Sequence, residues 1–105
     1  MQKIEIQSAE QFDQEIAKGN TVVDFYATWC NPCRMLGPVL EEVLKDKDVK
    51  LLKVDVDNLG ELASRYDVFS IPNVFLFKDG QQVGNFVGFK YASEVDSLVK
   101  NAFGI

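Results

Sequence analysis

The strongest constraint on the fold is the alternation of strand-like and helix-like segments along the chain. Residues 21–27, TVVDFYA, form a nearly continuous apolar run rich in β-branched and aromatic residues, as expected for a strand covered on both faces. Residues 49–57, VKLLKVDVD, also have strand character, and residues 35–46 between them have helical spacing of apolar side chains. Strands separated by helices favour parallel pairing with right-handed crossovers. The sequence therefore predicts an α/β fold.

Further segments extend this alternation to both ends of the chain. In the order strand, helix, helix, hairpin and helix, they are residues 3–7, 8–18, 58–68, 73–88 and 92–104. Asp79-Gly80 within the hairpin is a strong turn sequence, so the last two strands must pair antiparallel. The predicted order β-α-β-α-β-α-β-β-α gives a mixed central sheet with helices on both faces, in a single domain over residues 1–105. This pattern leaves the order of the strands across the sheet open.

The composition and net charge limit the classes of partner and the compartment expected for this chain. A chain of 105 residues with 47% hydrophobic and 26% charged residues can form a packed core without a disulfide scaffold. The formal net charge of -5 argues against nucleic acid or an anionic membrane as a partner. No apolar run approaches the roughly 18 residues that span a membrane, and the first residues lack a signal-peptide pattern. We therefore expect a cytoplasmic protein, in which paired cysteines are more often catalytic or metal-binding than structural.

The two cysteines of the chain, Cys30 and Cys33, lie where the strand of residues 21–27 gives way to a helix. Residues i and i+3 at a helix start have Cβ atoms about 5–6 Å apart, close enough for a disulfide after small adjustment. Pro32 between them suits a first helical turn. Unpaired N–H groups and the positive end of the helix dipole favour a thiolate there. We expect Cys30 to be the attacking sulfur and Cys33 the resolving one.

Two other interpretations of this pair are weaker. A zinc site needs about four ligands, but the chain has no further cysteine and no histidine, so carboxylates or a second subunit would have to complete it. An inert structural pair is disfavoured by the expected compartment. The residues therefore favour a redox-active dithiol and no metal.

Asp24 is an anomaly, because it places a carboxylate inside a strand otherwise suited to burial. An unpaired buried charge is costly, so Asp24 should be either partnered or protonated. Lys53 in residues 49–57 is the expected partner if these two strands are neighbours. Desolvation would raise the Asp24 pKa and suit a proton acceptor working near neutral pH. A purely structural Asp24–Lys53 pair is the alternative.

Three further residues, Pro72, Gly88 and Trp29, lie in connections or at strand ends. The base rate for X–Pro bonds predicts a trans bond at Pro72, which follows Ile71 and precedes the hairpin. Gly88, at the end of the second hairpin strand, permits either close approach of another backbone or a tight bend. Trp29, next to Cys30, is expected to be partly exposed and to make a binding contact.

Together these segments resemble the thioredoxin family over nearly the whole chain. The stretch VVDFYATWCNPC resembles the family's VDFWAxWCGPC, and RMLGP follows in place of KxxAP. LLKVDVD, SIPNVFLFKDG and a later VG then occur in the family's order. Several ordered motifs on the expected β-α pattern make the resemblance highly specific.

The resemblance implies a thioredoxin fold, with a central five-stranded mixed sheet flanked by four helices. Its strand order would be first, third, second, fourth and fifth, which sets the strands of Asp24 and Lys53 side by side. The resemblance also implies that Asp24 assists proton transfer at Cys33 through water, that Lys53 tunes it, and that the bond before Pro72 is cis, against the base rate. The substrate groove would be bordered by Trp29, Asn31, Pro32, Ile71, Pro72 and Gly88.

The implied function is reduction of protein disulfides by dithiol exchange through Cys30 and Cys33. The resemblance implies regeneration by a thioredoxin reductase, an NADPH-dependent flavoprotein, and the domain itself is expected to hold no cofactor and to be a monomer. Two alternatives stay open. One is a disulfide oxidant or isomerase outside the cytosol, and the other is a non-catalytic binding or assembly module whose dithiol is incidental.

Three positions depart from the family pattern. Asn31 stands in place of the usual Gly, Tyr26 in place of an often-seen Trp, and Asn73 in place of the usual Thr after the cis proline. Because Asn31 lies between the two cysteines, its side chain can compete for local hydrogen bonds and alter thiolate stability. The redox potential is therefore the property that Asn31 is most expected to change.

Overall fold

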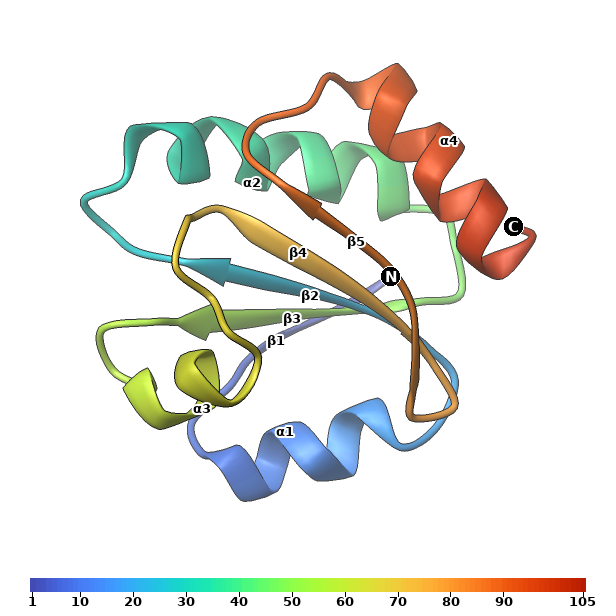
Figure 1. The fold of residues 1–105 in the computed structure, drawn as a ribbon. Helices are drawn as coiled ribbons and strands as arrows, with labels where there is room; N and C mark the ends of the chain where they lie inside the picture. The colour runs from blue at the N-terminus through green and yellow to red at the C-terminus, as the bar shows by residue number, and fades with distance from the viewer.

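The computed structural model describes residues 1–105 and has the predicted sequence of elements (Figure 1). The sequence-derived strands and helices are all present, with ends that differ from the expectation by a few residues. In chain order the elements are β1 (Gln2–Glu5), α1 (Ala9–Ile16), β2 (Asn20–Tyr26), α2 (Asn31–Leu44), β3 (Lys50–Asp55), α3 (Gly60–Arg65), β4 (Asn73–Lys78), β5 (Gln81–Val87) and α4 (Ala92–Phe103).

The strands form one mixed sheet in the order β1-β3-β2-β4-β5, which confirms the order implied by the family resemblance. β3 pairs in parallel with β1 and β2, whereas β4 runs antiparallel to β2 and β5. The register sets Lys53 opposite Asp24 on one side and opposite Glu5 on the other. Register partners in neighbouring strands point to the same face of a sheet. These three charged side chains therefore form one row across β1, β3 and β2.

Helices cover both faces of the sheet, with α2 and α4 on one face and α1 and α3 on the other (Figure 1). Alternate strand residues supply the two sides of the core, as the side-chain period of two requires. Burial on both sides explains why the central strands are nearly continuous apolar runs. Strand residues facing α2 and α4 include Val22, Leu51, Val74 and Leu76, and those facing α1 and α3 include Val23, Phe25, Leu52, Val54, Phe75 and Phe77.

Local sequence sets the ends of the elements that carry the site. The Ser8 hydroxyl caps α1 by accepting a hydrogen bond from the Gln11 N–H at 3.0 Å. Asp79 and Gly80 have φ values of 49° and 85°, so the β4–β5 hairpin has the two positive-φ residues of a tight turn.

None of the helices has the length and apolar character needed to cross a bilayer.

The Ile71–Pro72 peptide bond is cis, so the expectation of a trans bond is wrong and the family-based expectation is confirmed. The base rate reflects a preference of only about 0.5–1 kcal/mol for trans at X–Pro bonds. Tertiary contacts readily outweigh a preference of that size. Here the Pro72 carbonyl accepts a hydrogen bond from the Gly88 N–H at 2.8 Å, which ties the segment before β4 to the end of β5.

Candidate active site

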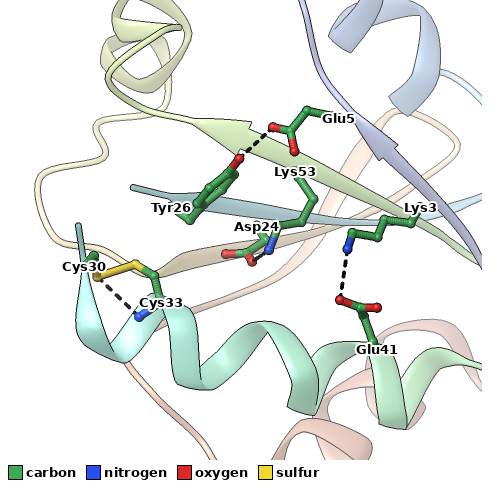
Figure 2. A network of polar contacts seen from close by, with 8 residues as sticks. All are labelled: Lys3, Glu5, Asp24, Tyr26, Cys30, Cys33, Glu41 and Lys53. Carbon is green, nitrogen blue, oxygen red and sulfur yellow. Dashed lines mark hydrogen bonds and ion pairs between the residues drawn. A yellow bond between two sulfur atoms is a disulfide. The ribbon is translucent and has the colours of Figure 1, made fainter. Parts of the chain in front are cut away.

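Cys30 and Cys33 form a disulfide at the N-terminus of α2, with Cα atoms 5.3 Å apart (Figure 2). Cys30 is the N-cap of α2, and its Sγ accepts a hydrogen bond from the Cys33 backbone N–H at 3.3 Å. Pro32 lies in the first turn, where a missing N–H costs little. The predicted placement of the pair, at a strand-to-helix connection and one helical turn apart, is confirmed.

Both cysteine residues are buried in the disulfide form, with Cys30 5% and Cys33 4% exposed. They pack against Ala27 and Ile71, and the Cys30 Sγ lies 3.9 Å from the Ile71 carbonyl oxygen. Exposure does not distinguish the two sulfurs. Their surroundings do, since Cys30 caps the helix and Cys33 lines a pocket on the inner side of α2.

Asp24 is completely buried on the face of the sheet that α2 covers. Its Oδ2 accepts a hydrogen bond from Lys53 Nζ at 2.7 Å, which confirms Lys53 as its partner (Figure 2). Its Oδ1 has no hydrogen-bond partner within the chain. Desolvation by burial raises the pKa of Asp24 above its ordinary value, and the Lys53 ammonium opposes this shift without cancelling it.

A pocket of about 310 Å³ is lined by both Cys33 and Lys53, the partner of Asp24. Such a volume has room for water, whose share of liquid volume is about 30 Å³ per molecule. The Lys53 ammonium reaches toward α2, where a Cβ built on Gly37 would lie 3.7 Å from it. The pocket is lined by Tyr26, Ala27, Thr28, Cys33, Arg34, Gly37 and Lys53.

Of the residues expected to border a substrate groove, Ile71 approaches the Cys30 sulfur through its carbonyl oxygen, and Trp29 and Asn31 flank Cys30 in the chain. Trp29 is 67% exposed, and its indole N–H donates to Asp57 Oδ2 at 2.8 Å. Gly88 has a φ of 88°, and a Cβ added to it would meet nothing within 4 Å. The Gly88–Pro72 hydrogen bond and the Ile71 contact with Cys30 bring these separate segments together. Asn31 and Pro32 are exposed at the start of α2, and the Asn31 side chain makes no hydrogen bond within the chain.

The structure adds residues that sequence reasoning did not identify as part of the site. The Tyr26 hydroxyl donates to Glu5 Oε2 at 2.8 Å, and Asp57 holds the Trp29 indole. Asp57 follows β3 at the edge of the sheet where the parallel strand β2 also ends. Because parallel strands bring their carboxyl ends to one edge, the sequence could have indicated that Asp57 lies near the residues after β2. Phe69, in the loop before the cis proline, is 89% exposed, and nothing in its local sequence predicted that exposure.

No three side chains among His, Cys, Asp and Glu converge in a geometry that could hold a metal ion. The tertiary structure therefore brings no further zinc ligands to the two cysteines. Cys30 and Cys33 are joined to one another, and no cluster of carboxylates lies beside them.

Comparisons with known proteins agree with this geometry. The family model described as Thioredoxin matches residues 3–101. A thioredoxin of Staphylococcus epidermidis is 51% identical over 81 residues, which cover 75% of this chain and 78% of that protein. A thioredoxin of Staphylococcus aureus is 49% identical with the same coverage.

Solved structures show the same fold. An Asn-to-Gln mutant of thioredoxin from Halobacterium salinarum superposes with a TM-score of 0.91 at 33% identity, covering 99% of this chain and 93% of that one. A reduced thioredoxin pre-protein from Schistosoma mansoni gives 0.87 at 32% identity, with 98% and 100% covered. The chain therefore belongs to the thioredoxin family, and it is a thiol–disulfide oxidoreductase whose redox-active pair is Cys30 and Cys33.

Proposed function

We propose that Cys30 is the attacking sulfur and Cys33 the resolving sulfur in the reduction of protein disulfides. The observation that supports this order is the hydrogen bond from the Cys33 N–H to the Cys30 Sγ at the N-terminus of α2. A backbone N–H and the positive end of a helix dipole both stabilise an anionic sulfur. In the reduced protein, Cys30 is therefore the sulfur held as a thiolate.

The exchange proceeds in two steps. The Cys30 thiolate attacks one sulfur of a substrate disulfide, forms a mixed disulfide with it, and releases the other substrate sulfur as a thiolate. Cys33, after losing its proton, attacks the Cys30 Sγ and releases the second substrate sulfur. The two electrons come from the protein dithiol, which becomes the Cys30–Cys33 disulfide. A Cα separation of 5.3 Å lets this ring close between neighbouring residues of one helical turn.

Asp24 is proposed to accept the Cys33 proton through water. Burial raises its pKa, which makes Asp24 a stronger base than an exposed carboxylate, and its Oδ1 has no partner in the chain. The pocket shared by Cys33 and Lys53 offers the space for a bridging water. Lys53 opposes protonation of Asp24 and so keeps a larger fraction of it in the basic form.

The substrate is proposed to bind beside the Cys30 sulfur, in a groove bordered by Trp29, Ile71, Pro72, Asn31, Pro32 and Gly88. An exposed indole anchored by Asp57 offers an apolar surface without a large entropy cost on binding. The open space above Gly88 admits a second backbone.

Family membership implies a reductase partner and disulfide substrates in general. The finer proposal is that an NADPH-dependent flavoprotein, a thioredoxin reductase, regenerates the dithiol. In this scheme residues 1–105 act as a single domain and a monomer in the cytoplasm, and all redox chemistry within the chain resides in its two cysteines.

Trapping tests the assignment of the two sulfurs. In a Cys33→Ser variant the resolving step is blocked, so a protein substrate should accumulate as a mixed disulfide on Cys30, detected by non-reducing electrophoresis and peptide mapping. Cys30→Ser is the matched control and should trap almost nothing. Accumulation through Cys33 in the Cys30→Ser variant would reverse the proposed roles.

Two measurements separate the alternative functions. A reduction potential near or below that of cytosolic glutathione indicates a reductant, and one well above it indicates an oxidant or isomerase. A binding module would keep full partner affinity in a double Cys→Ser variant, and its wild type would show no disulfide reduction in an assay coupled to NADPH and a purified reductase.

A further inference from the structure

Lys53 lies between two carboxylates but pairs with only one of them. The sheet register places Glu5 and Asp24 on either side of it in the row that crosses β1, β3 and β2. The ammonium lies 2.7 Å from Asp24 Oδ2 and forms no ion pair with Glu5. Glu5 is the more solvated of these two carboxylates, since Asp24 is completely buried. The contacts made by the neighbouring side chains bear on which carboxylate Lys53 selects.

Tyr26 makes the two contacts that account for this choice (Figure 2). Its hydroxyl donates to Glu5 Oε2 at 2.8 Å, so it occupies the competing carboxylate. Its ring lies under the Lys53 ammonium, with Nζ 4.6 Å from the ring centroid, a distance at which an aromatic face attracts a cation. The Lys53 side chain is only 12% exposed, and Tyr26 lines the same pocket as Lys53 and Cys33.

We propose that Tyr26 is a positioning residue that holds the Lys53 ammonium on Asp24 by binding Glu5 through its hydroxyl and Lys53 through its ring. A lysine stem has several rotatable bonds, so an unrestrained ammonium would divide its time among the available anions. Without the Tyr26 hydroxyl, Glu5 is free to draw Lys53 away from Asp24. Asp24 would then lose part of the interaction that favours its ionised form.

The other charged groups near this row have partners or positions that do not explain the pairing. Lys3 of β1 pairs with Glu41 of α2 at 3.1 Å. Asp55 of β3 accepts a hydrogen bond from the Asp57 N–H at 2.9 Å. From α2, the remaining groups are Cys33, which is held in the disulfide, and Arg34, which lines the pocket and forms no ion pair. Burial is the larger influence on the Asp24 pKa, and Lys53, which Tyr26 contacts, is the charged group that opposes it.

The test follows the Asp24 carboxyl directly by carbon-13 NMR in the disulfide form, in which the cysteines do not titrate. Tyr26→Phe keeps the ring and removes the hydroxyl. It should raise the pH at the midpoint of the Asp24 titration by several tenths of a unit, because Asp24 loses part of its interaction with the Lys53 charge. Tyr66→Phe, at a partly buried tyrosine packed against the core on the opposite face of the sheet, is the matched control and should leave the midpoint unchanged.

A double-mutant cycle shows whether Tyr26 acts through Lys53. In a Lys53→Met background, Tyr26→Phe should no longer displace the Asp24 midpoint, because the ammonium that it positions is gone. An equal displacement in both backgrounds would overturn the proposal, as would an unchanged midpoint in Tyr26→Phe alone.

The consequence for catalysis rests on the proton-transfer role proposed for Asp24. If that role holds, the low-pH limb of the disulfide-exchange rate moves upward in Tyr26→Phe together with the NMR midpoint. A displaced midpoint with an unmoved rate profile would support the positioning of Lys53 by Tyr26 and count against Asp24 as the base for Cys33.

Discussion

Lys53 donates to one oxygen of Asp24 at 2.7 Å, while the other oxygen of that buried carboxylate has no partner within the chain. Half of the carboxylate is therefore satisfied and half is not. An ionised group with an unsatisfied buried oxygen is costly, and this cost is the reason that burial outweighs the Lys53 ammonium in raising the Asp24 pKa. The same arrangement affects folding stability as well as proton transfer.

Asp24 should make the protein less stable as the pH rises. The folded carboxyl binds its proton more tightly than the unfolded one, whose pKa is near 3.8, so between that value and the raised folded pKa only the folded state keeps the proton. The free energy of unfolding then falls through this window by up to about 1.4 kcal/mol per pH unit. In Asp24→Asn this contribution is absent, so the stability difference between variant and wild type should grow with pH until Asp24 is ionised in both states.

Denaturant unfolding of both proteins in the disulfide form, over a series of pH values, measures that difference. Other titrating groups are common to the two proteins and cancel. Stability curves that run parallel from pH 4 upward would contradict the raised pKa of Asp24.

Replacement of Asn31 by Gly should change partner contacts more than the redox potential. The Asn31 side chain is exposed and makes no hydrogen bond to the sulfurs or to the first turn of α2, so the structure lends no support to competition for the Cys30 thiolate. For this couple, 30 mV corresponds to roughly 1.4 kcal/mol. Because no hydrogen bond of Asn31 is lost, we expect Asn31→Gly to shift the reduction potential by less than about 10 mV. Equilibration with glutathione, followed by thiol quantification, measures the shift. A change of several tens of millivolts would show that Asn31 contacts the thiolate in the reduced form.

Phe69 should contribute to the binding of protein substrates. Its exposed ring lies two residues before Ile71, whose carbonyl oxygen approaches Cys30, so its Cα is within about 7 Å of the Ile71 Cα. Phe69→Ser should lower kcat/KM about three- to tenfold for a protein disulfide by losing an apolar contact, and leave reduction of a small-molecule disulfide unchanged.

Val83→Ser is the control for this prediction, since Val83 is an exposed apolar residue near the hairpin end of β5. Its rates should match those of the wild type for both substrates. Equal losses on the protein and small-molecule substrates in Phe69→Ser would point to damage at the cysteines instead of a lost contact.

The chemistry of the cysteine pair could be predicted from the sequence because it depends on local rules. Their spacing, the proline between them and the strand-to-helix transition are all contained within a few residues. The partners of Tyr26 and Trp29 could not be predicted in this way. Glu5 is 21 residues from Tyr26 and Asp57 is 28 residues from Trp29, so both contacts depend on which strands are neighbours and in what register.

By itself, the sequence determined the alternation of elements, the two covered faces of the central strands and the placement of Cys30 at a helix N-terminus. These follow from side-chain periodicity and from the preferences of short segments. Only the tertiary structure decided that Glu5 lies on the other side of Lys53 from Asp24 and that Tyr26 binds Glu5, and it established the cis bond before Pro72 that local preference opposes. Each of these depends on contacts between segments distant in the chain, whose energies outweigh the small local preferences that a sequence pattern can express.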